Sequence, residues 1–183
     1  MNSWEVIHSS SDHTWRTPPD LFAEIDRDFR FELDAAALAP SALCADYFGP
    51  DHFDPARRDA FLAEWPAAPV WLNPPYGRGV GAWLDLAWRW SRRGSTVACL
   101  VMACTDTKWW HENASKADEI RLIAGRVRFL RGDSGKAASA APKGSALVVF
   151  RPHVPDRGWP GGPRIYNWQT TAGQNDSGTK GEE

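Results

Sequence analysis

The chain contains little cysteine, no long apolar segment and almost no net charge. Its three cysteines, Cys44, Cys99 and Cys104, are odd in number and lack the spacing of metal ligands, so we expect neither a disulfide framework nor a metal site. No run of apolar residues is long enough for a membrane helix, and residues 1–11 lack the apolar core of a signal peptide. These absences predict a cytoplasmic protein that does not bind a membrane.

The net charge of −2 argues against a nucleic-acid partner, but the charge is unevenly distributed along the chain. Residues 1–64 contain five Lys or Arg and 13 Asp or Glu, whereas residues 121–164 contain nine Lys or Arg and two Asp. A cationic ligand would suit the acidic half, and a phosphate backbone would suit the basic half. Two solvated faces of different charge are an alternative, because neighbours in sequence need not share a surface.

Length and composition predict one globular domain. The chain has 183 residues, of which 43% are hydrophobic and 24% are charged, so there is little room for a second core. Eleven tryptophans are far more than usual, and we expect most of them in the core or in pocket walls. We place the domain at 12–157, after an N-terminal arm, 1–11, and before a partly disordered C-terminal extension, 158–183.

The most informative stretch is Asn73-Pro74-Pro75-Tyr76, which follows the apolar run at 70–72. Two consecutive prolines cannot continue a helix or a central strand, so the chain stops rigidly there. Such a stop offers two fixed acceptors, the carboxamide oxygen of Asn73 and the carbonyl of Pro74, and Tyr76 adds a flat aromatic face. These groups suit a planar base with an exocyclic amine, such as an everted adenine. An isolated Asn-Pro-Pro-Tyr could also be an ordinary turn.

Apolar periodicity predicts an α/β fold with a mostly parallel sheet. Thr17 is a suitable N-cap for a helix at 18–29, and a second helix is expected at 80–93. The continuous apolar runs at 70–72 and 95–102 fit strands that are buried on both faces. In open α/β sheets ligands bind at the carboxyl ends of such strands, which is where Asn-Pro-Pro-Tyr stands.

The first half of the chain leaves room for only short strands. One is expected at 29–33, closing on Asp34 and the small residues 35–37, as at the start of a doubly wound ligand crevice. Another short strand fits within 44–51 and ends at the turn formed by Gly49 and Pro50. The interval 35–69 is shorter than two strand–helix repeats need, so the middle of the fold must be abbreviated.

The C-terminal half contains three further candidate strands. They are expected at 119–123, 126–130 and 146–150, and the last two should form an antiparallel hairpin that closes the sheet. This hairpin brackets a long basic loop, 131–145. Its basic residues are Arg131, Lys136 and Lys143. A mobile basic loop fits a DNA contact, although a loop of such length can also be merely disordered.

In these surroundings the segment from Asn73 to Tyr76 resembles the catalytic motif of phage-type, Dam-like DNA N6-adenine methyltransferases, which use S-adenosylmethionine. Thr-Asp-Thr at 105–107, followed by Trp-Trp-His at 109–111, is a second strong point of similarity. The resemblance implies a minimal Rossmann-like methyltransferase that modifies the exocyclic N6 amine of adenine in double-stranded DNA. It also implies a phage or prophage gene in a bacterial host, and we expect a monomer.

The same resemblance assigns roles to three groups of residues. The catalytic group is Asn73, Pro74, Pro75 and Tyr76. The cofactor-binding group is Trp15, Thr17, Pro18, Asp34, Ala35, Asp59 and Phe61. The DNA-binding group, apart from the basic loop, is Thr105, Asp106, Lys108, Trp109, Trp110 and His111.

Simpler interpretations exist for several of these residues. Asp59 could cap a short helix, and Thr105 or Asp106 could cap the helix that follows them. Trp109 and Trp110 could belong to the core. Two adjacent tryptophans point in different directions on a helix, however, so we expect at least one of them to be exposed for base stacking.

The segment from Leu33 to Ala37 departs from the usual cofactor loop because it contains no Gly-x-Gly, which makes a close approach of the backbone to a cofactor less assured. This departure favours an alternative in which the chain is a non-catalytic DNA-binding module on a degenerate methyltransferase fold. Among enzymes, the alternatives are methylation of cytosine N4, of adenine in RNA, or of a protein glutamine. An amide also offers two hydrogens to a pair of acceptors.

Overall fold

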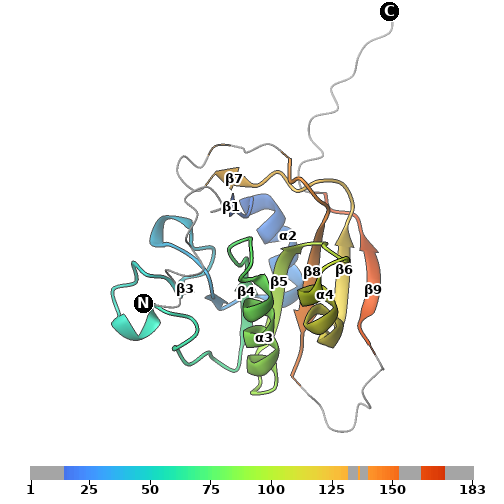
Figure 1. Cartoon of the computed structure of the whole chain (residues 1–183). Coiled ribbons are helices and arrows are strands. Elements are labelled where there is room, and N and C mark those ends of the chain that lie inside the picture. The colour runs from blue at the N-terminus through green and yellow to red at the C-terminus, as the bar shows by residue number, and fades with distance from the viewer. Residues whose placement is uncertain (1–14, 132–135, 137–139, 153–161, 172–183) are drawn as a thin grey trace, which may run out of the picture.

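The computed structural model describes residues 15–131, 136, 140–152 and 162–171. The expected N-terminal arm, 1–11, and the chain from 172 onward lie outside the described residues. The described part forms a seven-stranded sheet with helices on both faces, and a separate two-stranded sheet lies at one end of it (Figure 1).

The large sheet is mostly parallel, with the strand order β3-β2-β4-β5-β8-β6-β9. Its strands are β2 (Leu33–Asp34), β3 (Asp46–Tyr47), β4 (Pro69–Leu72), β5 (Thr96–Met102), β6 (Glu119–Ile123), β8 (Ser145–Phe150) and β9 (Arg164–Trp168). Neighbouring strands pair in parallel, except that β8 is antiparallel to both β5 and β6. The predicted α/β class with a mostly parallel sheet is confirmed, and the arrangement is compatible with a Rossmann-like fold.

The expected hairpin between 126–130 and 146–150 does not form. The strand β8 is antiparallel, but it lies between β5 and β6 and pairs with both. Of the segment 126–130, only Leu130 enters a strand, β7 (Leu130–Arg131), which pairs with β1 (Trp15–Arg16) in the small sheet. All six residues of β8 are buried, and a position between two strands buries an apolar strand better than a hairpin at the sheet edge would.

The helix α2 (Pro19–Phe29) covers one face of the sheet, as its sequence predicted. Its buried residues, Leu21, Ile25 and Phe29, recur at intervals of four and form one apolar stripe. They pack with Trp71 of β4 in a core cluster on this face.

Both ends of α2 differ from the prediction. Pro18 occupies the N-cap and no side chain caps the helix, so the predicted capping role of Thr17 is wrong. At the other end Arg30 adopts a left-handed conformation with φ of 56°, and its N–H donates to the carbonyl of Asp26 at 2.7 Å. This turn takes up the first part of the strand expected at 29–33, which leaves only the two-residue β2.

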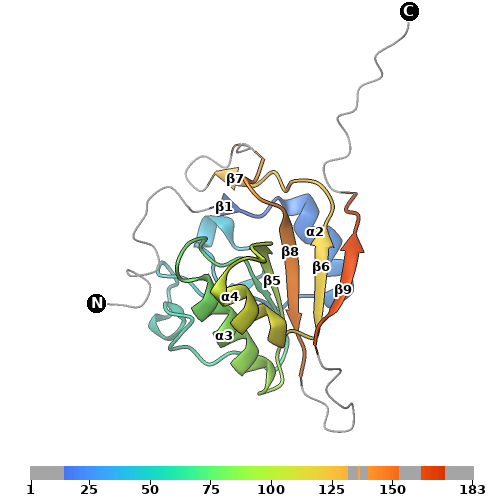
Figure 2. The same cartoon turned by 45° about the vertical axis from the view of Figure 1, so that its right-hand side comes forward.

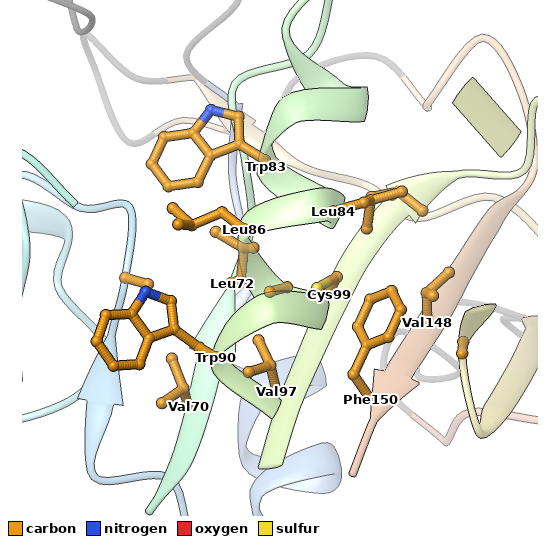
Figure 3. Packing of buried hydrophobic residues seen from close by; sticks show 14 of the residues in the cluster. Val70, Leu72, Trp83, Leu84, Leu86, Trp90, Val97, Cys99, Val148 and Phe150 are labelled. Atoms are coloured by element: carbon orange, nitrogen blue, oxygen red, sulfur yellow. The ribbon is translucent and has the colours of Figure 1, made fainter. Parts of the chain in front are cut away.

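Two helices, α3 (Val80–Ser91) and α4 (Lys108–Glu112), cover the opposite face (Figure 2). The helix predicted at 80–93 is confirmed as α3. Figure 3 shows how its inward side packs on the sheet. The contacting residues labelled there are Val70, Leu72, Trp83, Leu84, Leu86, Trp90, Val97, Cys99, Val148 and Phe150, all of which are buried.

The middle of the fold is abbreviated, as predicted. Residues 35–68 contain only β3 and two 3₁₀ helices, Ala39–Ser41 and Pro55–Arg57. The chain turns sharply at Gly49, where a Cβ atom would lie 1.8 Å from the carbonyl oxygen of Ala37, so only glycine fits. This short route brings β4 directly beside β2.

The strand β9 pairs in parallel with β6 at the edge of the sheet. Residues 164–168 of the expected C-terminal extension therefore belong to the sheet. None of the helices in the described ranges has the length and apolar character that a membrane crossing requires.

Candidate active site

The parallel strands β2, β4 and β5 end at one edge of the sheet, and the segments that follow them meet there. Asp34 is the last residue of β2, and Asn73 follows the last residue of β4. Because β8 runs the opposite way, its first residue, Ser145, stands at this same edge opposite Met102 of β5. The small β1–β7 sheet lies beyond this edge in both views (Figures 1 and 2).

The carboxamide of Asn73 is held in one orientation by the N-terminal strand. Its Nδ2 donates a hydrogen bond of 2.8 Å to the main-chain carbonyl of Trp15. Its Oδ1 is buried and has no hydrogen-bond partner among the described residues. A buried carbonyl oxygen without a donor is costly, and Asn73 Oδ1 is an acceptor that no described residue uses.

Three aromatic rings pack around this corner. The ring centroids of Trp15 and Tyr76 lie 5.9 Å apart, those of Trp15 and Phe129 5.3 Å, and those of Tyr76 and Phe129 5.6 Å. The hydroxyl of Tyr76 is buried without a partner in the described chain, and this burial raises the pKa of the phenol, which is therefore neutral. Phe129 is fully buried and ties the segment before β7 to the Asn-Pro-Pro-Tyr corner.

The other residues assigned to the catalytic motif continue from this anchored position. Pro74 is buried and Pro75 is half-buried. The rigid stop that the two prolines predict after β4 is confirmed, since β4 ends at Leu72 and α3 begins only at Val80. The sequence therefore located the corner correctly, while the roles of its four residues stay a prediction.

The N-terminal segment contributes a further unpartnered polar atom. Thr17 is only 4% exposed, and its Oγ1 is buried with no hydrogen-bond partner in the described part of the chain. The next residue, Pro18, lines a groove of about 360 Å³ together with Leu21, Val127 and Arg128. The sequence predicts that Trp15 and Thr17 bind the cofactor. Their segment contacts Asn73 through the Trp15 carbonyl, and their role in binding a cofactor stays a prediction.

Asp34 is buried, and its carboxylate organises the loop after β2. Its two oxygens accept hydrogen bonds from the N–H groups of Ala36 at 3.3 Å and Leu43 at 3.2 Å. Burial raises the pKa of Asp34 to about 6, against the lowering effect of these two hydrogen bonds. Ala35 is fully buried, and its N–H donates to the carbonyl of Trp71 at 2.9 Å. These contacts give the segment a structural role, and its role in binding a cofactor stays a prediction.

Asp59 and Phe61 lie in a tight turn instead of a helix. The Oδ1 of Asp59 accepts from the N–H of Phe61 at 2.9 Å, and its main-chain carbonyl accepts from Leu62 and Ala63. Asp59 therefore closes a turn, and the short helix that it was expected to cap does not form. The ring of Phe61 packs edge-on against Trp83 with centroids 4.7 Å apart, and its assignment to a cofactor stays a prediction.

The expectation of an exposed tryptophan at the start of α4 is wrong. Trp110 is 9% exposed and belongs to the core under α3, and Trp109 is half-buried. Gly81 of α3 approaches so closely that a Cβ there would lie 2.9 Å from the Cβ of Trp109. The helix α4 has only five residues and packs against α3. Trp110 is buried in this contact, so its role is packing.

The polar residues around these tryptophans are at the surface. Thr105, Asp106, Lys108 and His111 are exposed, and Lys108 forms an ion pair of 3.5 Å with Glu112. Neither Thr105 nor Asp106 caps α4. The N-cap is Thr107, whose hydroxyl donates instead to the carbonyl of Cys104 at 2.7 Å. Their contact with DNA stays a prediction.

The basic loop begins next to the site. Arg131 pairs with Trp15 across the small sheet and is exposed, as are Lys136 and Lys143. The N–H of Arg131 donates to the carbonyl of Lys136 at 2.8 Å. Residues 132–135 and 137–139 of this loop lie outside the described residues. In the described ranges no group of three or more His, Cys, Asp or Glu is arranged to hold a metal ion.

Two residues of this edge escaped the sequence interpretation. Phe129 was taken only as part of a strand, and Ser145 only as the end of the basic loop. Ser145 is 2% exposed, and its hydroxyl is buried without a partner among the described residues. A lone hydroxyl in the apolar run Ser-Ala-Leu-Val-Val-Phe was the one available signal.

Comparison with known proteins gives two findings. A family model described as DNA N-6-adenine-methyltransferase (Dam) matches residues 6–173, a range that includes every residue of the site. The chain is also similar to the DNA N-6-adenine-methyltransferase of Escherichia phage T1, with 26% identity over 155 residues. That similarity covers 75% of this chain and 62% of the phage protein, so the chain spans less than two thirds of that relative.

Proposed function

Since the chain belongs to the family of DNA N-6-adenine-methyltransferases (Dam), we propose that it transfers a methyl group from S-adenosylmethionine to the N6 amine of adenine in double-stranded DNA. The observation that supports this proposal best is the orientation of Asn73. Its Nδ2 is bound to the carbonyl of Trp15, so its Oδ1 is the atom left to accept a hydrogen.

The corner can hold an exocyclic amine from two sides. Asn73 Oδ1 accepts one amine hydrogen, and the carbonyl of Pro74, which a following proline keeps out of any helix, accepts the other. Two such bonds draw the nitrogen lone pair out of conjugation with the ring. Catalysis then rests on positioning, which can supply roughly 7–11 kcal/mol of the barrier. A carboxamide is not a base, so the proton that the amine loses passes to solvent.

Tyr76 provides the aromatic surface of the corner. Its ring is fixed by edge contacts with Trp15 and Phe129, and a fixed ring can receive a base that leaves the duplex stack. Burial keeps the Tyr76 hydroxyl neutral, so it can donate a hydrogen bond but carries no charge. The motif thereby supplies acceptors and stacking without a titrating group.

The residues of the N-terminal segment fit S-adenosylmethionine. The orphaned Thr17 hydroxyl lies two residues from the Trp15 carbonyl that holds Asn73, so a polar ligand group bound there would lie next to the catalytic corner. Asp34, at the end of the adjacent strand β2, supplies a buried negative charge that favours a cation nearby. When bound, S-adenosylmethionine supplies an electrophilic methyl group.

Basic residues support DNA as the substrate. The exposed side chains on the segment after β6 and in the following loop are Arg126, Arg128, Arg131, Lys136 and Lys143. Phosphate contacts of this kind fix the register of a protein on a duplex. Phe129 lies within this segment and packs on Tyr76. A contact between these basic side chains and the DNA phosphates would therefore lie close to the everted base. We propose that the enzyme acts as a monomer in the cytoplasm of a bacterial host.

The test is the product that the purified chain forms. DNA lacking adenine and cytosine methylation is incubated with S-adenosylmethionine, digested to nucleosides and examined by mass spectrometry. N6-methyladenine is expected, and Asn73→Ala should abolish it while binding of S-adenosylmethionine, measured by calorimetry, is retained. The matched control is Asn167→Ala on the exposed edge strand β9, which should leave the rate unchanged.

Other results would change the conclusion in defined ways. N4-methylcytosine as the product would replace the adenine assignment. Methylation of RNA or of a protein glutamine, but not of DNA, would replace the substrate. Failure to bind S-adenosylmethionine at all would make the chain a non-catalytic module.

A further inference from the structure

Ser145 has a hydroxyl that no described residue of the chain uses. Its Oγ is buried and lacks a hydrogen-bond partner in the described part of the chain. Two other buried serines show the usual arrangement, since Ser91 donates to the carbonyl of Trp88 and Ser95 to the carbonyl of Pro66, each at 2.7 Å. Burying a hydroxyl without a partner is unfavourable, and alanine would fill the start of an apolar strand without this cost.

The position of Ser145 is fixed by the sheet. It is the first residue of β8 and lies opposite Met102 at the carboxyl end of β5. The carbonyl of the preceding Gly144 accepts a hydrogen bond of 2.8 Å from the N–H of Ala103. The hydroxyl is therefore presented by a rigid element and not by the loop that precedes it.

Ser145 lies on the same face of the sheet as the catalytic corner. Side chains alternate along a strand, and Leu147 and Val149 of β8 pack in the cluster under α2. Ser145, two residues before Leu147, points to the same side. Tyr76 and Trp15 contact that same cluster.

The strand register gives the spacing between Ser145 and Asn73. Leu72 lies opposite Cys99 of β5, and Cys99 lies opposite Val148 of β8, so Asn73 is level with Leu147. Ser145 is two strands across and two residues further along, which places the two backbones roughly 12 Å apart. This separation matches the length of a nucleobase with a hydrogen bond at each end.

We propose that the Ser145 hydroxyl donates a hydrogen bond to a ring nitrogen of the everted adenine and thereby helps to select the base. This inference rests on the proposed function. Once Asn73 and Pro74 accept the amine hydrogens, the polar atoms that remain on an adenine are its ring nitrogens, which are acceptors. A hydroxyl is a suitable donor for them, and its orphaned state in the free protein is then explained.

The first test compares Ser145→Ala with the wild-type protein. Plasmid DNA methylated by the wild-type chain is sequenced to find the target, and duplex oligonucleotides containing it are then used as substrates. Ser145→Ala should lower kcat/KM by about tenfold, the effect of one hydrogen bond lost to a buried polar group. Ser145→Thr, which keeps the hydroxyl, should recover most of the activity.

Stability provides the matched control. Ser145→Ala should leave the thermal unfolding midpoint unchanged or raise it, because no bond within the chain is lost. Ser95→Ala, at the opposite edge of the sheet, should lower the midpoint by removing its bond to Pro66 and should leave kcat/KM unchanged. A Ser145→Ala protein that unfolds readily would overturn the proposal, since the hydroxyl would then have a structural partner.

The second test identifies the atom. The target adenine is replaced by 1-deaza-, 3-deaza- or 7-deazaadenine, each of which lacks one ring nitrogen. For one of these substrates the wild-type protein should lose about as much kcat/KM as Ser145→Ala loses on adenine, and combining the two changes should cost nothing further. If the loss of kcat/KM caused by Ser145→Ala adds to the loss caused by each of the three analogues, Ser145 does not contact the base.

The outcomes separate this inference from the proposed function. A wild-type chain that methylates no adenine refutes both. A wild-type chain that methylates adenine, together with Ser145→Ala activity within twofold of it, refutes only the role of Ser145.

Discussion

Replacing Asn73 with aspartate tests the orientation that the Trp15 carbonyl imposes. The substitution keeps the size of the side chain and even adds an acceptor oxygen, so a mechanism that needs only acceptors would tolerate it. It removes the Nδ2–H group, however, that donates to Trp15 at 2.8 Å. A carboxylate oxygen would then face a carbonyl oxygen inside a buried corner, and the two would repel each other.

The structural cost follows from this single contact. The variant loses one hydrogen bond and leaves the Trp15 carbonyl without that donor, which together cost about 2 kcal/mol. For a domain of this size the thermal midpoint should fall by about 4–8 °C. The displaced side chain should lower kcat/KM at pH 8 by about 100-fold or more, because the amine is no longer aligned.

The pH dependence gives the prediction its distinctive result. Burial next to a carbonyl raises the pKa of a carboxyl, so the folded variant binds a proton more tightly than the unfolded one. The stability deficit relative to the wild-type protein should therefore be small below about pH 4 and should grow as the pH rises to 7. Once protonated, the introduced carboxyl group can again donate to the Trp15 carbonyl, so part of the activity should return at lower pH.

Two measurements check this reasoning. Urea unfolding of the wild-type protein and the Asn73→Asp variant between pH 4 and 8 gives the deficit, and methyl transfer over the same range gives the activity. Asn73→Ala, which has neither donor nor acceptor, is the control and should show no such pH-dependent recovery. Activity of Asn73→Asp within tenfold of wild type at pH 8, or a deficit that does not vary with pH, would refute the orientation argument.

Two further changes test other parts of the site. Asp34 has its pKa raised from 3.8 to about 6 by burial, so its contribution to stability is present below pH 3.8 and is lost as the pH rises through 6. Asp34→Asn should abolish this pH dependence. The unfolding free energy of the wild-type protein, measured in urea relative to that of the variant, should therefore fall by about 3 kcal/mol between pH 4 and 7. Lys143→Ala should reduce the salt dependence of DNA binding, the slope of log K against log salt, by about 0.9 if Lys143 contacts a phosphate. Arg92→Ala, after the end of α3, is its control, and equal slopes for the two variants would contradict the contact.

The sequence predicted the elements whose signal is local. The helix α2 and the strand β5 follow from apolar periodicity and from one unbroken apolar run, and the stop after β4 follows from two prolines. The abbreviated middle followed from chain length alone. Each of these inferences depends on residues close together in the chain, where sterics and patterning decide the structure.

The sequence did not predict the contacts between distant segments. The apolar pattern of β8 alone is compatible with pairing to 126–130 or to β6. Burial of both faces of β8 favours its position between β5 and β6. The burial of Trp110 depends on the closeness of α3, which a helix of five residues does not reveal in its own pattern. The partner of Asn73 is a main-chain carbonyl 58 residues away, and every residue has such a carbonyl.

The unpartnered atoms at the sheet edge share one physical explanation. Thr17 Oγ1, Asn73 Oδ1, Tyr76 Oη and Ser145 Oγ are buried and lack partners among the described residues. Each costs about 1–3 kcal/mol, whereas a whole domain is stable by only about 5–15 kcal/mol. Four such atoms near one edge of the sheet would be costly if they stayed without partners, and β4 and β8 limit the movement of Asn73 and Ser145. Polar atoms kept in this state bind a polar ligand without first breaking bonds to the protein, which is the arrangement that catalysis by positioning requires.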